Sequence, residues 1–171
     1  MDYLYNMKQS KITTFFNGNA STVIQPKPSI PVESKPTEYS LFFDGCSKGN
    51  PGAAGAGAVI YENNVEIYNE SIFVGRKETN NTAEYTGLII GMKEAVRRNI
   101  KHLKVNGDSL LVIKQMKGEY QVKSENMIPL FRAAKQLQTH FDKITFTHVY
   151  RDDNKRADEL SNIGLECKKS T

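Results

Sequence analysis

The order of hydrophobic patterns along the chain restricts its fold more than any other feature. Three stretches with the alternation or apolar content of β-strands come first, at residues 39–46, 56–62 and 65–74. Turn residues separate them, including a Gly-Asn-Pro-Gly stretch and the pair Asn63-Asn64. We therefore expect the domain to begin with a meander of three antiparallel strands.

Helix and strand patterns alternate in the rest of the chain. Apolar residues recur at helical spacing between residues 81 and 98, which predicts an amphipathic helix that lies on the sheet. Further strand patterns cover residues 102–109 and 143–150, and further helix patterns cover residues 109–117, 125–141 and 154–167. The order βββαβααβα predicts an α/β fold with a mixed sheet and helices on its faces.

The N-terminal part has a composition that cannot form a packed core. Four of the six prolines lie between residues 26 and 36, among serine, threonine, lysine and glutamate. We expect a disordered, proline-rich linker over residues 17–37. This linker joins a short peptide, residues 1–16, to one compact domain over residues 38–171.

Charge and cysteine content restrict the partners and the compartment. Lysine and arginine number 23 against 19 acidic residues, and the net charge of +4 fits a polyanionic partner such as a nucleic acid. The two cysteines, Cys46 and Cys167, have no metal-ligand spacing, which favours a reducing, intracellular compartment over a disulfide framework. No apolar run has the length of a membrane span. We expect a monomer without a membrane partner.

Four acidic residues occupy strand ends or helix starts in this interpretation: Asp44, Glu84, Asp108 and Asp158. Three of them have ordinary structural explanations. Glu84 follows Asn81 by three residues, as in a helix cap, and Asp108 fits a helix N-cap. Asp158 fits a solvated helix start, where the helix dipole favours acids. Asp44 has no such explanation, because it closes an apolar strand and has no guaranteed partner nearby in the sequence.

The four acids would form a metal site if they lie close together in the folded chain. If the first and fourth strands are neighbours, Asp44 and Asp108 emerge side by side at one edge of the sheet. Helices that begin nearby would bring Glu84 and Asp158 to them. Four carboxylates so close repel one another unless divalent cations lie between them. Oxygen ligands favour Mg²⁺ or Mn²⁺ over zinc, and two such ions about 4 Å apart would hydrolyse a phosphodiester.

The motifs around the four acids resemble those of the type 1 ribonuclease H family. They read DGCSKGNPG from Asp44, TNNTAEYTGL around Glu84, NGDSLLV around Asp108 and NKRADELSN around Asp158, in family order and spacing over residues 39–166. The resemblance implies a ribonuclease H-like fold, in which three antiparallel strands and then two parallel ones form a five-stranded mixed sheet with helices on both faces. It also implies an endoribonuclease that hydrolyses the RNA strand of RNA/DNA hybrids and leaves 5′-phosphate and 3′-hydroxyl ends.

The same resemblance implies roles for individual residues. The four acids would be catalytic and would hold two Mg²⁺ ions, for which Mn²⁺ could substitute. Asn50, Asn80 and Asn81 match family positions that contact the hybrid near the scissile phosphate. The backbone of three further residues would border the RNA 2′-hydroxyls: Gly45, Cys46 and Ser47. Their small size would let the sugar-phosphate backbone come close.

The connection before the last helix departs from the family pattern. Only residues 150–153 separate the last strand from Asn154, which is too few for the histidine-bearing loop of many members. We expect Arg151 to take part of that role, with Asn154 as a second auxiliary residue. His148 lies on the strand by alternation, so we expect it to be a structural histidine.

Two other departures affect substrate contacts. The basic helical protrusion of some relatives is missing, so Lys117, Tyr120 and Lys123 are the nearest candidates for phosphate contact. A solvated basic loop is the alternative explanation of these residues. Leu110 stands where several relatives have a polar residue that contacts the substrate.

The N-terminal peptide resembles a second kind of motif. Residues 9–16 read QSKITTFF, and Gln9, Ile12, Phe15 and Phe16 have the spacing of peptides that bind sliding clamps of the PCNA type. The three apolar side chains would lie on one side of a helical turn and enter an apolar pocket. This resemblance implies recruitment by a clamp to sites of DNA replication, where primer hybrids are the natural substrate.

Two other functions are compatible with the same motifs. A structure-specific DNA nuclease would share the fold and the metal site, because fold alone does not determine chemistry. A non-catalytic adaptor would use the chain only to bind a clamp and nucleic acid. The pair Asn80-Asn81 and the GNPG stretch at residues 49–52 favour hybrids as the substrate, and the presence of all four acids favours an enzyme.

Overall fold

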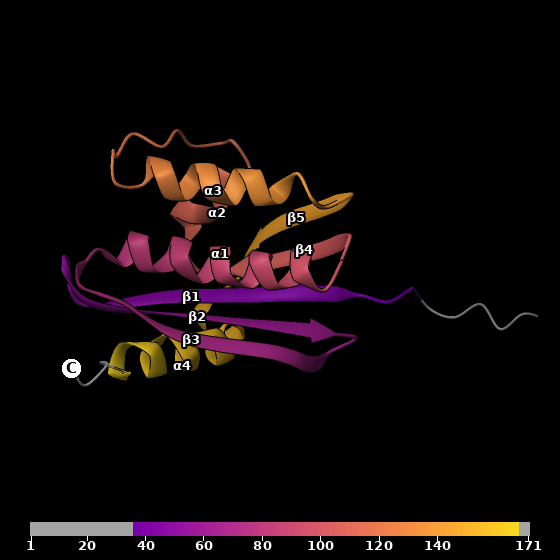
Figure 1. Cartoon of the computed structure of the whole chain (residues 1–171), viewed down its shortest axis with the longest axis horizontal. Helices are drawn as coiled ribbons and strands as arrows, with labels where there is room; N and C mark the ends of the chain where they lie inside the picture. The colour runs from indigo at the N-terminus through magenta and orange to yellow at the C-terminus, as the bar shows by residue number, and fades with distance from the viewer. Residues whose placement is uncertain (1–35, 168–171) are drawn as a thin grey trace, which may run out of the picture. The chain divides into compact units, whose positions relative to one another are not determined.

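The computed structural model describes residues 36–167, which form one mixed sheet and the helices packed on it (Figure 1). The strands are β1 (Tyr39–Gly49), β2 (Gly52–Glu62), β3 (Val65–Glu78), β4 (His102–Gly107) and β5 (Lys143–His148). The helices are α1 (Asn80–Arg97), α2 (Leu110–Met116), α3 (Ile128–Gln138) and α4 (Lys155–Glu166), and a 3₁₀ turn, η1 (Arg151–Asp153), precedes α4. The predicted order of strands and helices is confirmed.

The first three strands form the predicted antiparallel meander. β1 pairs with β2 over their whole length, and β2 continues into β3 through a tight turn. In that turn Asn63 and Asn64 have φ angles of 48° and 67°. Asparagine tolerates this left-handed backbone better than most residues, and two such residues in succession match the twist of a hairpin.

β1 lies in the middle of the sheet, whose strand order is β3-β2-β1-β4-β5. It pairs with β4 in parallel, so that Phe43 lies opposite Gly107, and Gly107 lies opposite His148 of β5. Parallel pairing requires a crossover connection, which α1 supplies. The residues that follow these partners, Asp44 within β1 and Asp108 directly after β4, therefore lie side by side, as predicted.

The helices cover both faces of the sheet. α1, α2 and α3 lie on one face, and α4 lies on the other (Figure 1). Alternation along β1 serves both faces: Leu41 and Phe43 belong to the larger core, whereas Phe42 packs against the smaller cluster of Val59 and Leu160. The predicted α/β fold is confirmed. Within residues 36–167 no helix is long and apolar enough to cross a membrane.

Several elements end at other residues than their patterns indicate. β2 begins earlier and β3 ends later than predicted, because the two strands continue to pair as far as Gly52 and Glu78. The added part of β3 is polar and lies on an edge strand, so it carries little hydrophobic signal. α3 is shorter than predicted and begins at Ile128, with Pro129 in its first turn, where a proline costs no hydrogen bond.

Two glycines allow helices to approach the sheet closely. A Cβ atom at Gly45 would lie 2.1 Å from the backbone nitrogen of Glu84 in α1. A Cβ atom at Gly57 of β2 would lie 2.5 Å from the backbone nitrogen of Ser161 in α4. Close packing leaves no room for either atom, so any larger residue would displace the helix. These two contacts set the positions of Glu84 and Ser161.

The contact at Gly45 gives this glycine a second explanation. The sequence suggested that a small residue after Asp44 leaves room for the sugar-phosphate backbone of the substrate. In the structure α1 occupies the space beside Gly45, so helix packing by itself explains the glycine. The approach of substrate to the backbone of Gly45, Cys46 and Ser47 stays a prediction.

Replacement of Gly45 by alanine should therefore be costly. The Gly45→Ala variant is expected to lose about 3 kcal/mol of unfolding free energy in urea titrations, because α1 must move away from β1. Gly118→Ala is the control: Gly118 has φ +80° but no atom within 4 Å of a Cβ, so it should lose only about 1 kcal/mol from its left-handed backbone. Equal losses in the two variants would show that helix packing is not the reason for Gly45.

Candidate metal-dependent active site

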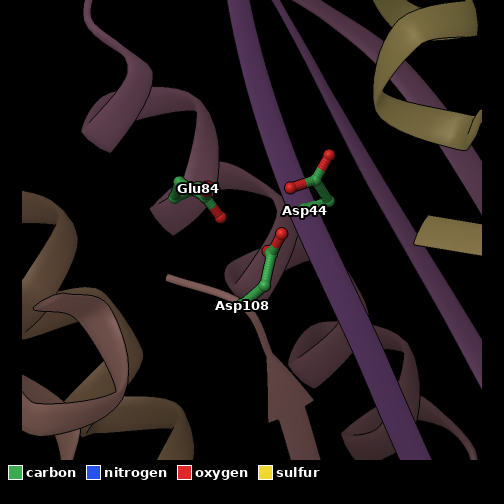
Figure 2. Close-up of side chains that lie close together, drawn as sticks. All are labelled: Asp44, Glu84 and Asp108. Carbon is green, nitrogen blue, oxygen red and sulfur yellow. The ribbon is translucent and has the colours of Figure 1, made fainter. Parts of the chain in front are cut away.

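Three acids from distant parts of the sequence meet beyond the end of β4. Asp44 comes from β1, Glu84 from α1 and Asp108 from the residue after β4. One carboxylate oxygen of each lies within 4.8 Å of the other two. Figure 2 shows the three side chains converging on one region. Asp44 and Glu84 are each only 5% exposed, whereas Asp108 is partly exposed, so two of the three acids are buried.

Helix capping does not explain these acids. The N-cap of α1 is Thr79, whose side chain accepts a hydrogen bond from the backbone N–H three residues on, at 3.1 Å. The N-cap of α2 is Ser109, whose side chain accepts a corresponding bond at 3.5 Å. The capping explanations of Glu84 and Asp108 are therefore wrong, and both carboxylates are available to the cluster.

Asp158 lies at the border of this cluster. It is in the first turn of α4, its side chain is 28% exposed, and it forms an ion pair with Arg151. It lies outside the group of three whose oxygens are mutually close. Its charge nevertheless raises the pKa of Asp44, so it acts electrostatically on the cluster. The role of Asp158 as a metal ligand stays a prediction.

Burial and mutual repulsion make two of the acids weak. The pKa of Asp44 is raised to about 6: burial raises it most, the hydrogen bond from Ser161 lowers it, and the charges of Asp108 and Asp158 raise it. The pKa of Glu84 lies well above its usual range, because of burial first and the charges of Asp44 and Asp108 second. A cation bound between these groups would oppose both shifts.

The donor set fits a divalent cation. Glu84 Oε2 is buried and has no hydrogen-bond partner among residues 36–167. A buried polar atom without a partner destabilises the fold, and a hard cation with oxygen ligands would satisfy it. The group contains carboxylates and neither histidine nor cysteine, which favours such a cation over zinc.

Two side chains from α4 and its N-cap hold the acids in place. Ser161 Oγ donates a hydrogen bond to Asp44 Oδ2 at 2.5 Å. Asn154 Nδ2 donates to Asp108 Oδ1 at 3.1 Å and to the backbone oxygen of Phe43 at 3.0 Å. Asn154 was expected to be auxiliary, whereas Ser161 was not predicted. The available signal was its spacing of three residues from Asp158, which puts both on one face of a helix.

The predicted substrate residues lie around the acids. Asn50 Oδ1 accepts a hydrogen bond from the backbone N–H of Asn80 at 3.2 Å, and Asn80 Nδ2 lies 3.5 Å from Glu84 Oε1 as a donor. These bonds place the turn after β1 beside the start of α1. The other predicted substrate residues adjoin the acids in α1 and β1: Asn81, Gly45, Cys46 and Ser47.

The departures from the family pattern also have definite positions. His148 ends β5, and its Nε2 lies 3.2 Å from the backbone oxygen of Asp108, a contact in keeping with the structural role expected for it. Lys117 forms an ion pair with Glu119 at 2.7 Å, and the Tyr120 ring lies 4.7 Å from the ammonium nitrogen of a lysine in α2. The predicted clamp-binding residues lie outside the described part of the chain: Gln9, Ile12, Phe15 and Phe16.

Comparisons with known proteins identify the family. The family described as reverse transcriptase-like matches residues 42–164. A ribonuclease H of Pseudomonas fluorescens is 32% identical over 142 residues, which cover 74% of this chain and 89% of that protein. The chain belongs to the ribonuclease H family. A solved member of this family, LC11-RNase H1 in complex with an RNA/DNA hybrid, has 31% identity and a TM-score of 0.71, covering 75% of this chain and 97% of that one.

Some ribonuclease H relatives are much longer than the matched region. A bifunctional protein of Mycobacterium tuberculosis is 38% identical over 126 residues, which cover 72% of this chain but 34% of that protein. The chain thus spans about a third of the length of this relative. The similarity concerns the ribonuclease H domain.

The raised pKa of Asp44 predicts how stability depends on pH when no metal is bound. The folded pKa of about 6 exceeds the ordinary value of 3.8, so the folded state binds more protons than the unfolded state between these values. The protonated Asp44 carboxyl therefore stabilises the folded state below pH 4, and this stabilisation is lost as the pH rises through 6. The loss amounts to about 2–3 kcal/mol of unfolding free energy.

The Asp44→Asn variant tests this prediction, because its amide carries no charge but can still accept the Ser161 hydrogen bond. Urea titrations in the presence of a chelator should show that the free energy of unfolding falls less between pH 5 and pH 7 for Asp44→Asn than for the wild type. Asp152→Asn is the control, since the Asp152 side chain is 94% exposed, and it should decline like the wild type. An unchanged decline in Asp44→Asn would contradict the assigned pKa shift.

Proposed function

We propose that this chain is an endoribonuclease that hydrolyses the RNA strand of RNA/DNA hybrids and leaves 5′-phosphate and 3′-hydroxyl ends. The observation that carries the proposal is the convergence of Asp44, Glu84 and Asp108 from three separate elements in a member of the ribonuclease H family. The similarity to a ribonuclease H1 solved with an RNA/DNA hybrid supports the choice of substrate.

The proposed cofactor is Mg²⁺, for which Mn²⁺ could substitute. Asp44, Glu84 and Asp108 would hold it, and Asp158 would complete the ligands for a second ion. When bound, two such ions activate the attacking water and stabilise the leaving oxygen of the phosphodiester. The unpartnered Glu84 Oε2 and the raised pKa values of Asp44 and Glu84 support this assignment.

The residues that support the acids would keep them oriented for this chemistry. Ser161 occupies one oxygen of Asp44 and leaves the other free for a ligand. Asn154 ties Asp108 to the backbone of β1 at Phe43, which fixes the distance between the two strand ends. Arg151 would attract the phosphate backbone toward the acids, since its side chain is 75% exposed and carries a full positive charge.

Substrate selection would depend on residues beside Glu84. Asn50, Asn80 and Asn81 would contact the hybrid near the scissile phosphate, and the backbone of residues 45–47 would border the RNA 2′-hydroxyls. These hydroxyls distinguish RNA from DNA at a given site. The hydrogen bond from the Asn80 side chain to Glu84 supports this assignment, because it places a proposed substrate-binding group next to a proposed catalytic acid.

We also propose that the N-terminal peptide recruits the enzyme to a sliding clamp of the PCNA type during DNA replication. The spacing of Gln9, Ile12, Phe15 and Phe16 supports this proposal, together with the proline-rich linker that follows them. A tether of this kind raises the local concentration of the enzyme near primer hybrids without any further contact.

Replacement of Asp44 should remove cleavage but retain binding. The Asp44→Asn variant is expected to lose about 10³-fold or more in the rate of hybrid cleavage, because the cluster loses a charged ligand. Wild type, Asp44→Asn and the exposed control Asp152→Asn are compared on labelled hybrid, double-stranded RNA and double-stranded DNA, with Mg²⁺ or with a chelator. Equal cleavage of double-stranded DNA, or activity retained by Asp44→Asn, would overturn the proposal.

The clamp interaction should depend on the two adjacent phenylalanines. The double variant Phe15→Ala/Phe16→Ala is expected to lose binding to a purified sliding clamp in calorimetry, because both apolar anchors are removed. Hybrid cleavage in solution should not change. The matched control Thr13→Ala/Thr14→Ala lies in the same peptide outside the motif and should bind like the wild type. Undiminished binding by the phenylalanine variant would exclude this motif.

A further inference from the structure

Tyr150 is the most exposed large hydrophobic side chain of residues 36–167, with 78% of its surface open to solvent. It lies in the short connection between β5 and η1, directly before Arg151. An exposed ring contributes little to folding, since the hydrophobic effect follows the apolar area removed from water. The structure nevertheless places this ring against His148, in the segment that follows β5.

Two backbone hydrogen bonds anchor the segment that carries Tyr150. The N–H of Val149 donates to the backbone oxygen of Gly107 at 3.0 Å, and the N–H of Asp153 donates to the backbone oxygen of Tyr150 at 2.9 Å. Gly107 is the last residue of β4 and directly precedes Asp108. The segment is therefore fixed to the strand end that carries one of the catalytic acids.

His148 supports the tyrosine ring from one side. The centroids of the two rings lie 5.9 Å apart and their planes are inclined by 76°, which is a favourable edge-to-face arrangement. The same imidazole places its Nε2 3.2 Å from the backbone oxygen of Asp108. One side chain thus connects the Tyr150 ring to the backbone of a catalytic acid.

The residues near Tyr150 in the sequence are those expected at a surface that binds nucleic acid. Arg151 follows it and supplies a positive charge for phosphates. Leu110, two residues after Asp108 in the sequence, is 47% exposed and is a second large apolar side chain open to solvent. RNA-type helices have a wide, shallow minor groove in which sugars are accessible, and aromatic rings pack on nucleotides without sequence preference.

We propose that Tyr150 is a substrate-binding residue, whose ring packs against the sugar of a nucleotide next to the scissile phosphate. The inference rests on the proposed cleavage of hybrids and adds a contact that neither the acids nor the asparagines supply. His148 is a positioning residue in this arrangement, because it holds the ring and does not touch the substrate. Tyr150 takes part in no bond-making step, so its loss should affect KM and leave kcat nearly unchanged.

Steady-state kinetics on a labelled hybrid test this inference. Tyr150→Ala should raise KM about 5- to 20-fold and change kcat less than about twofold, whereas Tyr150→Phe should stay within about twofold of the wild type in both. Thermal unfolding should be the same in all three proteins. An unchanged KM in Tyr150→Ala, or a loss confined to kcat, overturns the inference alone. A wild-type chain that does not cleave hybrids overturns the proposed function together with it.

A binding measurement gives a readout that does not depend on cleavage. The chain contains no tryptophan, so Tyr150→Trp in the Asp44→Asn background introduces a single indole beside the site. Its emission should change when uncut hybrid is added, in parallel with the anisotropy of the labelled hybrid. Val65→Trp in the same background is the control, since Val65 is 64% exposed at the start of β3 and should not respond. Constant emission from the indole at position 150 overturns the inference.

Discussion

Repulsion between buried carboxylates is the interaction around which this structure is organised. Asp44 and Glu84 are nearly inaccessible, and their carboxylates lie close to that of Asp108. Such a group destabilises the fold in the absence of a cation, so the rest of the molecule must hold it together. The elements that do so are the parallel pairing of β1 with β4 and the close approach of α1 at Gly45. Stability elsewhere in the domain thus maintains an arrangement that is unfavourable by itself.

α4 connects the packing of the domain with the chemistry of the site. Its buried face covers the smaller hydrophobic cluster through Ala157 and Leu160, and the same buried side supplies Ser161 to Asp44. Asn154, the N-cap of the same helix, bonds to both Asp108 and the backbone of β1. A shift of this helix would therefore disturb the orientation of two acids at once, even though neither acid belongs to it.

The sequence predicts the elements better than it predicts their contacts. Hydrophobic periodicity and turn residues are properties of short stretches of sequence. They therefore predict the order of strands and helices and the turn at Asn63 and Asn64. The side-by-side position of Asp44 and Asp108 follows once β1 and β4 are assumed to be neighbours. The bond from Ser161 to Asp44 could not be predicted, because it joins residues 117 positions apart through the packing of α4 on β2. The close approach of α1 to Gly45 could not be predicted for the same reason, since it is also set by tertiary packing.

Within residues 36–167, Asp158 differs from the other three acids in forming an ion pair, with Arg151. The Arg151 guanidinium neutralises it, whereas Glu84 has an oxygen with no partner among residues 36–167. If Asp158 takes part in metal binding, as proposed, the metal ion would compete with the guanidinium for this carboxylate. A released arginine beside the acids would then be free to pair with a phosphate of the arriving hybrid. The ion pair would thus couple the completion of the metal site to the arrival of substrate, with Tyr150 next to the arginine that exchanges partners.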